Sequence, residues 1–147
     1  MKLTVYHGSL NEFSKPLLDR SKNYRDFGNG FYVTENYYDA LNILNFKTGF
    51  VYEYQVNLDN LVIKEFNDDE QLISYNDDYD VVIGKTLGNC ARLFKQVRNG
   101  QKEVNKDDLI ELLKQTPYQN QMCLKTEKAL NELELTNIHY YNAEDFV

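Results

Sequence analysis

The chain lacks tryptophan and has only two cysteines and two prolines among its 147 residues. Cys90 and Cys123 stand outside any Cys-x-x-Cys or Cys/His cluster, so the common zinc sites are excluded and no metal is expected. Two isolated cysteines in a chain of this length indicate buried thiols rather than a disulfide framework. A reducing compartment follows, and we expect a cytoplasmic protein.

Long apolar runs and clusters of positive charge are also missing. No segment approaches the roughly 18 apolar residues of a membrane-crossing helix, and residues 2–6 alternate like a strand rather than a signal peptide. Sixteen basic residues stand against 23 acidic ones, a formal net charge of −7. A surface of that sign repels polyanions, so nucleic acid is disfavoured as a partner. The common nucleotide-loop, metallohydrolase and serine-hydrolase motifs do not occur.

Aromatic residues are plentiful instead, with 12 Tyr and 8 Phe, and hydrophobic residues make up 42% of the chain. This composition and length predict one globular domain spanning 1–147. Alternating, β-branched or aromatic segments predict short strands at residues 2–6, 30–34, 50–57, 61–66, 81–84, 122–124 and 138–141. Helical spacing and capping residues predict helices at about 36–47, within 67–80, near 90–97, from 105 to before Pro117, and over 127–133. The mixture indicates an α+β fold with a mainly antiparallel sheet.

Three places could carry chemistry. His7 ends the first predicted strand beside Gly8 and Ser9, where a ligand can approach the bare backbone closely. A structural or simply exposed histidine is the alternative, and we interpret the other histidine, His139, as structural. Residues 28–32 place two glycines before Phe31 and Tyr32, and such a turn can deliver an aromatic ring to a flat ligand. A turn before an ordinary core strand explains the same pattern.

The third place is Asn120-Gln121, which opens the strand Met122-Cys123-Leu124. Taken alone, a strand-opening amide more often caps a sheet edge than binds a substrate. The functional interpretation therefore depends on the three places being considered together.

Together they resemble the poly(ADP-ribose) polymerase branch of the ADP-ribosyltransferases. That family carries a His-Gly-Ser or His-Gly-Thr at the end of its first strand, a Gly-x-Gly-x-Tyr strand, and an Asn-Glu before a late apolar strand. The similarity is closer to a poorly characterised bacterial group with this fold, and the shared strings lie at 6–9, 26–32, 78–84 and 120–130. The resemblance implies an ADP-ribosyltransferase-like α+β fold, a mainly antiparallel split β-sheet with flanking helices.

The resemblance also implies a pocket for NAD as co-substrate. In it, Gly8 would pair its backbone with the nicotinamide carboxamide, His7 would hold ribose hydroxyls, and Tyr32 would stack on the nicotinamide. A second stacking ring is expected on the helix that follows, from Tyr37, Tyr38 or Phe46. The remaining predicted contacts with NAD are Ser9, Gly30 and Phe31 in the pocket, and Arg20 and Arg25 on the pyrophosphate.

Gln121 departs from the pattern, because chain-elongating relatives have Glu there. An amide can bond a ribose hydroxyl but supplies neither a full negative charge nor a base. The resemblance therefore implies a mono-ADP-ribosyltransferase with an unknown acceptor. Members of the bacterial group resemble toxins, so a toxin–antitoxin pair with a small antitoxin-like partner is expected by analogy. An NAD glycohydrolase and a catalytically silent module that binds NAD, ADP-ribose or a protein are the alternatives; an RNA 2′-phosphotransferase is disfavoured by the charge.

Overall fold

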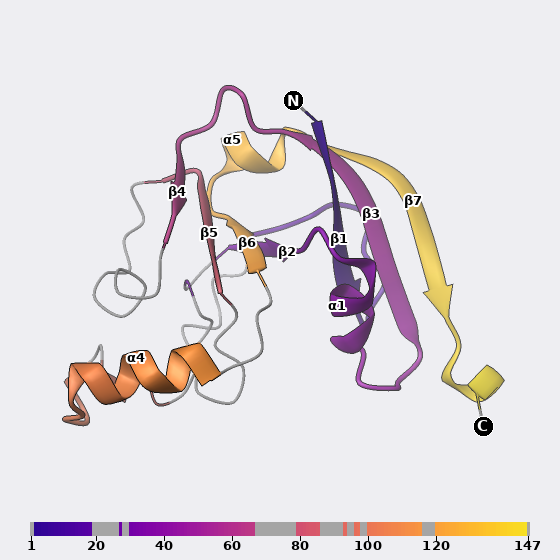
Figure 1. Ribbon diagram of the computed structural model, residues 1–147. Coiled ribbons are helices and arrows are strands. Elements are labelled where there is room, and N and C mark those ends of the chain that lie inside the picture. Colours follow the sequence, from indigo (N-terminus) through magenta and orange to yellow (C-terminus); the bar gives the residue numbers. More distant parts are fainter. Residues whose placement is uncertain are drawn as a thin grey trace.

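The computed structural model describes residues 2–18, 27, 30–66, 79–85, 93, 96–97, 100–115 and 120–146. Within them, seven strands form two sheets, which lie side by side (Figure 1). Arg20, Arg25 and Cys90 lie outside the described residues, as do most of the predicted helices within 67–80 and near 90–97. Among the described residues, no helix is long and apolar enough to span a membrane.

The first sheet has three antiparallel strands in the order β1-β3-β7. Its members are β1 (Lys2–Ser9), β3 (Gly49–Asn57) and β7 (Leu133–Tyr141). The predicted strand at 50–57 is confirmed, but β1 continues past residue 6 because His7, Gly8 and Ser9 pair with β3. Likewise β7 begins at Leu133, which pairs with Val56, and not at residue 138. Pairing with β3 extends both strands beyond the boundaries predicted from the local pattern.

The second sheet has the order β2-β6-β5-β4. Its strands are β2 (Phe31–Val33), β6 (Asn120–Leu124), β5 (Val81–Lys85) and β4 (Ile63–Glu65). All pairs are antiparallel except β4 with β5, which is parallel. The α+β class with a mainly antiparallel sheet is thus confirmed.

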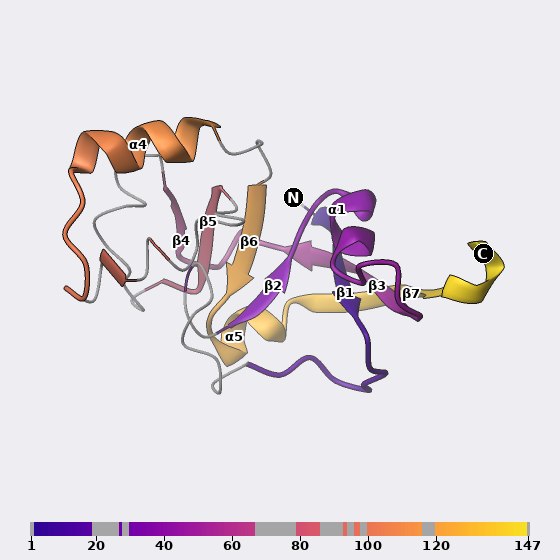
Figure 2. The same cartoon turned by 90° about the horizontal axis from the view of Figure 1, so that it is seen from below.

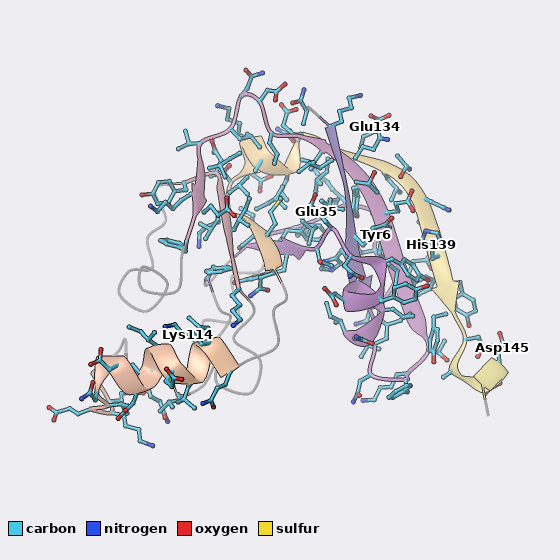
Figure 3. The ribbon with its side chains drawn as sticks, viewed as in Figure 1. Tyr6, Glu35, Lys114, Glu134, His139 and Asp145 are labelled. Atoms are coloured by element: carbon cyan, nitrogen blue, oxygen red, sulfur yellow. The ribbon has the colours of Figure 1, made fainter. Side chains whose placement is uncertain are left out.

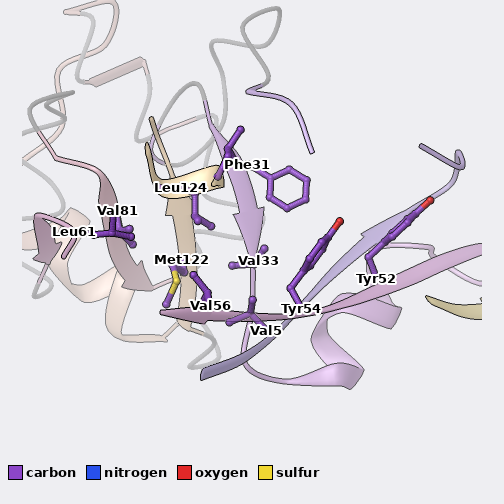
Figure 4. Close-up of a cluster of buried hydrophobic side chains, with 12 residues drawn as sticks. Val5, Phe31, Val33, Tyr52, Tyr54, Val56, Leu61, Val81, Met122 and Leu124 are labelled. Atoms are coloured by element: carbon purple, nitrogen blue, oxygen red, sulfur yellow. The ribbon is translucent and has the colours of Figure 1, made fainter. Parts of the chain in front are cut away.

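The two sheets are joined where β1 passes the end of β2. Tyr6 donates its N–H to the carbonyl oxygen of Thr34 at 2.7 Å, and the N–H of Thr34 returns to Tyr6 at 3.0 Å. Aliphatic and aromatic side chains from both sheets pack together in the space between them (Figure 4). The fully buried members of this core, at 0% exposure, include Val5, Val56, Val81 and Leu124.

Short helices flank the sheets. Helix α1 (Tyr37–Asn42) covers one face of β1 and β3, and the 10–18 segment lies on the other side of β1 (Figure 2). The Oδ1 of Asn36 accepts the N–H groups of Tyr38 and Asp39, which confirms the predicted N-cap. The helix was expected to reach about residue 47, but it ends at Asn42. The left-handed backbone at Asn45 and Phe46, with φ of 51° and 63°, is incompatible with a continuing helix.

The later helices are α4 (Lys106–Gln115), α5 (Glu127–Leu130) and the 3-10 turn η2 (Ala143–Phe146). The predicted helix that starts near residue 105 is confirmed as α4. Helix α5 is shorter than the predicted 127–133, because the chain enters β7 at Leu133. Cys123 is in no disulfide and is buried, at 0% exposure, as predicted for the cysteines.

Asp80 accepts hydrogen bonds from three residues that lie next to strands of the second sheet. Its Oδ2 accepts the N–H of Val62 at 2.9 Å, and its Oδ1 accepts the hydroxyl of Thr126 at 2.7 Å. Its carbonyl oxygen accepts the N–H of Lys125 at 2.8 Å. The bonds from Val62 and then from Thr126 hold the pKa of the Asp80 carboxyl below its ordinary value.

The outer edge of β7 is irregular. The register between β3 and β7 shifts beside Glu53 and Tyr54, and Thr136 is the extra residue on β7. The neighbouring Asn137 turns its Oδ1 to the N–H of Ile138 at 2.8 Å. The bulge and this local bond interrupt the edge near its middle.

Candidate functional site

His7 is placed by the end of β1 and is held by β2. Its Nδ1 lies 2.6 Å from the carbonyl oxygen of Tyr32. A carbonyl oxygen can only accept, so Nδ1 carries the hydrogen, and the neutral ring then has Nε2 as its acceptor. The partner thus selects one tautomer of the imidazole.

Aromatic rings surround the imidazole of His7. Phe31 stacks on it with centroids 4.2 Å apart and an interplanar angle of 22°. Phe13 stands nearly perpendicular to both, at 5.7 Å from His7 and 6.2 Å from Phe31. Two of these rings come from strands and the third from the 10–18 segment. They make one aromatic wall.

This wall belongs to a cavity of about 220 Å³, which we call the donor cavity. It opens between the end of β1, the 10–18 segment and the start of β2. Its lining residues are His7, Ser9, Phe13, Lys15, Leu17, Gly30, Phe31 and Tyr32. The structure therefore brings five predicted site residues together, because His7, Ser9, Gly30, Phe31 and Tyr32 all line it.

Phe13, Lys15 and Leu17 were not predicted. An aromatic and a cationic residue between the two glycine-containing motifs were the available signal in the sequence. Lys15 supplies a positive charge at the cavity, a role expected of Arg20 and Arg25, which lie outside the described residues.

Gly8 does not line this cavity, but it stands between two residues that do, His7 and Ser9, and it presents a polar backbone edge. Tyr6 directs its N–H and C=O away from β3 to Thr34, and the antiparallel ladder repeats that direction at Gly8, two residues on. Gly8 is buried, yet no described residue pairs with its N–H or C=O on that edge. On the face of β1 that α1 covers, a Cβ atom added to Gly8 would lie 2.2 Å from the carbonyl oxygen of Ala40, so the packing of α1 requires glycine at this position. A buried donor and acceptor side by side match an amide group.

Tyr32 lies on the opposite face of the sheet from Phe31. Its ring is 9% exposed and packs in a cluster with Phe27, Phe66 and Cys123. Its hydroxyl accepts the N–H of Phe27 at 3.0 Å. Most of the ring is therefore core, and its predicted stacking on nicotinamide stays a prediction.

Gln121 is placed by β6, where it pairs with Gly84 of β5. Tyr32 pairs with Cys123, so the alternation along β6 puts Gln121 on the same face as Tyr32. His7 lines the donor cavity from the other face, and Gln121 does not line that cavity.

The candidates for a second stacking ring do not reach the donor cavity. Tyr37 of α1 packs edge-on against Tyr6 at 5.6 Å and against His139 at 5.2 Å. Both partners belong to the three-stranded sheet and are labelled in Figure 3. Tyr38 and Phe46 are 71% and 85% exposed. Phe13 supplies the additional ring of the donor cavity. Helix α1 covers the face of β1 that carries Tyr6, and not the face that carries His7, and the stacking of one of these three rings on nicotinamide stays a prediction.

His139 has a structural partner, consistent with its predicted role. Its Nε2 lies 3.0 Å from Oε1 of Glu53, and Thr136 donates to Oε2 of the same carboxylate at 3.1 Å. The hydrogen bond from His139 is the main reason that the pKa of Glu53 is lowered. Across the described residues, no group of three His, Cys, Asp or Glu side chains could hold a metal ion.

Comparison with known proteins assigns the chain to a family. The model of a protein family of unknown function, DUF3990, matches residues 3–135. The chain belongs to this family. The match includes His7, Tyr32 and Gln121, so the candidate site lies within the DUF3990 domain. Neither the curated proteins nor the solved structures gave a match.

Proposed function

We propose that this DUF3990 protein is a cytoplasmic, NAD-dependent mono-ADP-ribosyltransferase. The buried edge of Gly8 carries the proposal: its N–H and C=O can satisfy the oxygen and the NH₂ of a primary carboxamide together. Nicotinamide bears such a carboxamide on a flat ring. An aromatic-walled cavity with a lysine, adjoining this edge, suits the rest of an anionic dinucleotide.

His7 would orient the ribose. Its Nδ1 hydrogen is committed to Tyr32, so the neutral ring meets a sugar hydroxyl through Nε2 as acceptor. Stacking on Phe31 fixes the plane of the imidazole. A ring fixed in this way can hold the ribose in one orientation without reorganising during the reaction.

The proposed reaction breaks the bond between the ribose C1 and the nicotinamide nitrogen. The bonding electrons leave with nicotinamide, and an acceptor nucleophile attacks the oxocarbenium-like carbon and loses its proton. Gln121 can bond a ribose hydroxyl but cannot act as a base. We therefore propose transfer of a single ADP-ribose to an acceptor that is itself a good nucleophile. A toxin–antitoxin role with a small antitoxin-like partner is the proposed biological setting.

Nicotinamide release decides between this activity and its absence. Purified protein is incubated with NAD, with and without cell lysate, and in parallel with the deamidated analogue that carries a carboxylate. We expect NAD to be cleaved and the deamidated analogue to stay intact, because the carboxylate of the analogue cannot donate a hydrogen bond to the carbonyl oxygen of Gly8. Equal turnover of both dinucleotides would refute the role of Gly8, and no release from either would refute the transferase.

A silent binding module is the second candidate, and Gln121 is the observation that favours it. A neutral amide in place of Glu removes a charge that can be worth about 10²–10³ in rate. NAD binding measured by calorimetry, without nicotinamide release, would establish this alternative.

A further inference from the structure

The 10–18 segment is fastened to the three-stranded sheet by Tyr52. The Tyr52 hydroxyl accepts the N–H of Phe13 at 2.9 Å and is 3.3 Å from the carbonyl oxygen of the same residue, to which it donates. The two rings stack with centroids 4.1 Å apart and an interplanar angle of 26°. Tyr52 is 1% exposed and sits in the middle of β3. One core residue therefore fixes both the backbone and the ring of Phe13, and we call these contacts between Tyr52 and Phe13 the clamp.

Phe13 separates two cavities. On one side is the donor cavity, and on the other a second cavity of about 240 Å³ has Tyr52, Tyr54 and Leu133 in its lining. Phe13 and Lys15 line both. A shift of Phe13 would remove part of the donor cavity's aromatic wall and open it toward the second cavity. The shape of the donor cavity thus depends on where Phe13 is held.

We propose that Tyr52 is a positioning residue for NAD, acting through Phe13; this inference rests on the proposed function. Tyr52 does not line the donor cavity. The Tyr52 hydroxyl fixes the distance of the 10–18 backbone from the sheet. The Tyr52 ring fixes the plane in which Phe13 faces His7 and Phe31. The additional ring of the aromatic wall comes from this segment and not from α1.

The decisive variant is Tyr52→Phe, which keeps the ring and removes the hydroxyl. Tyr54→Phe is the matched control, since Tyr54 is 3% exposed, neighbours Tyr52 on β3, and makes no hydrogen bond to the described part of the 10–18 segment. Amide exchange of Phe13 is measured first, on the protein without ligand. We expect protection to fall at least about fivefold in Tyr52→Phe and to stay unchanged in Tyr54→Phe. Unchanged protection in Tyr52→Phe would overturn the clamp.

The second readout is NAD turnover. The clamp stabilises the cavity equally for ground and transition states, so Tyr52→Phe should raise KM about three- to tenfold and leave kcat within about twofold. Phe13→Leu should raise KM in the same way without touching Tyr52. A Tyr52→Phe protein that loses Phe13 protection but keeps its KM would show a structural role only and overturn the proposal. Absence of NAD binding by the wild-type protein would instead refute the proposed function, and the exchange data would still report the clamp.

Discussion

The imidazole of His7 bonds the carbonyl oxygen of Tyr32 across the gap between β1 and β2, with an Nδ1–O distance of 2.6 Å. The bond lies beyond the Tyr6–Thr34 bridge, at the point where backbone pairing between the two strands has stopped. One side chain thus continues the connection that the backbone ends. In the proposed function the two ring nitrogens have separate tasks, and substitutions can separate them.

His7→Asn should keep the fold and lose activity. The Asn amide nitrogen can occupy the place of Nδ1 and donate to Tyr32, whereas nothing replaces Nε2. We expect kcat/KM for NAD to fall at least about tenfold, the equivalent of about 1.4 kcal/mol, with little change in urea midpoint. His7→Gln is the reciprocal control, because its amide reaches the place of Nε2 and leaves the carbonyl oxygen of Tyr32 without this donor. Equal turnover of NAD by His7→Asn and the wild type would refute the proposed contact between His7 Nε2 and the substrate.

Gln121→Glu should raise the rate of nicotinamide release. A carboxylate on this face would stabilise the positive charge that develops on the ribose, an effect worth up to about 10²–10³ in rate. We expect the rate constant for nicotinamide release, measured under single-turnover conditions, to increase at least about tenfold. Gln55→Glu, on β3, adds the same charge elsewhere and should have no effect. If the two variants behave alike, Gln121 is not at the reacting centre.

Tyr32→Phe tests the buried hydroxyl. The N–H of Phe27, a residue 2% exposed, would lose its acceptor, and such an unpaired group costs about 1–3 kcal/mol. Urea unfolding should show a loss in that range, while Tyr38→Phe, at an exposed ring, should leave stability within about 0.5 kcal/mol. This variant is preferable to Tyr32→Ala, which would remove a core ring and confuse lost binding with lost folding. Equal stability of both Phe variants would contradict the bond.

Asp80→Asn should reduce the acid sensitivity of the fold. The folded-state pKa of Asp80 is lowered, chiefly by the N–H of Val62 and then by Thr126. The stability it contributes is therefore present above the unfolded-state pKa, about 3.9, and is lost as the pH falls through the folded-state value. Unfolding free energies of wild type and variant should converge from about pH 5 downward. Glu111→Gln, an exposed carboxylate on α4, is the control; an unchanged gap at low pH would refute the assignment.

Local patterns in the sequence were enough to predict the strands that bury one face and the capped helices. The alternation at 50–57 and the Asn36 cap correspond to β3 and the start of α1. The end of β1 and the beginning of β7 could not be predicted from the sequence. The residues there owe their strand conformation to pairing with β3 and not to their own composition.

The candidate site was predictable where neighbours in sequence are neighbours in space. His7, Ser9 and Phe31 follow from two motifs and meet in one cavity. Phe13 and its partner Tyr52 are separated by 39 residues, and no local pattern links them. The sequence could not choose among Tyr37, Tyr38 and Phe46 for a related reason: which face of β1 receives α1 depends on the close approach of Ala40 to Gly8, a tertiary contact.

The irregular edge of β7 has a consequence for how the protein behaves at high concentration. This outer strand has neither proline nor lysine to deter a foreign strand, and Leu135, Ile138 and Tyr140 along it are exposed. The bulge at Thr136 and the Asn137 side chain on Ile138 break its row of backbone donors into two short stretches. Asn137→Val would remove one of these two interruptions and leave only the bulge, so overexpression of that variant should yield a larger fraction of inclusion bodies than the natural chain does.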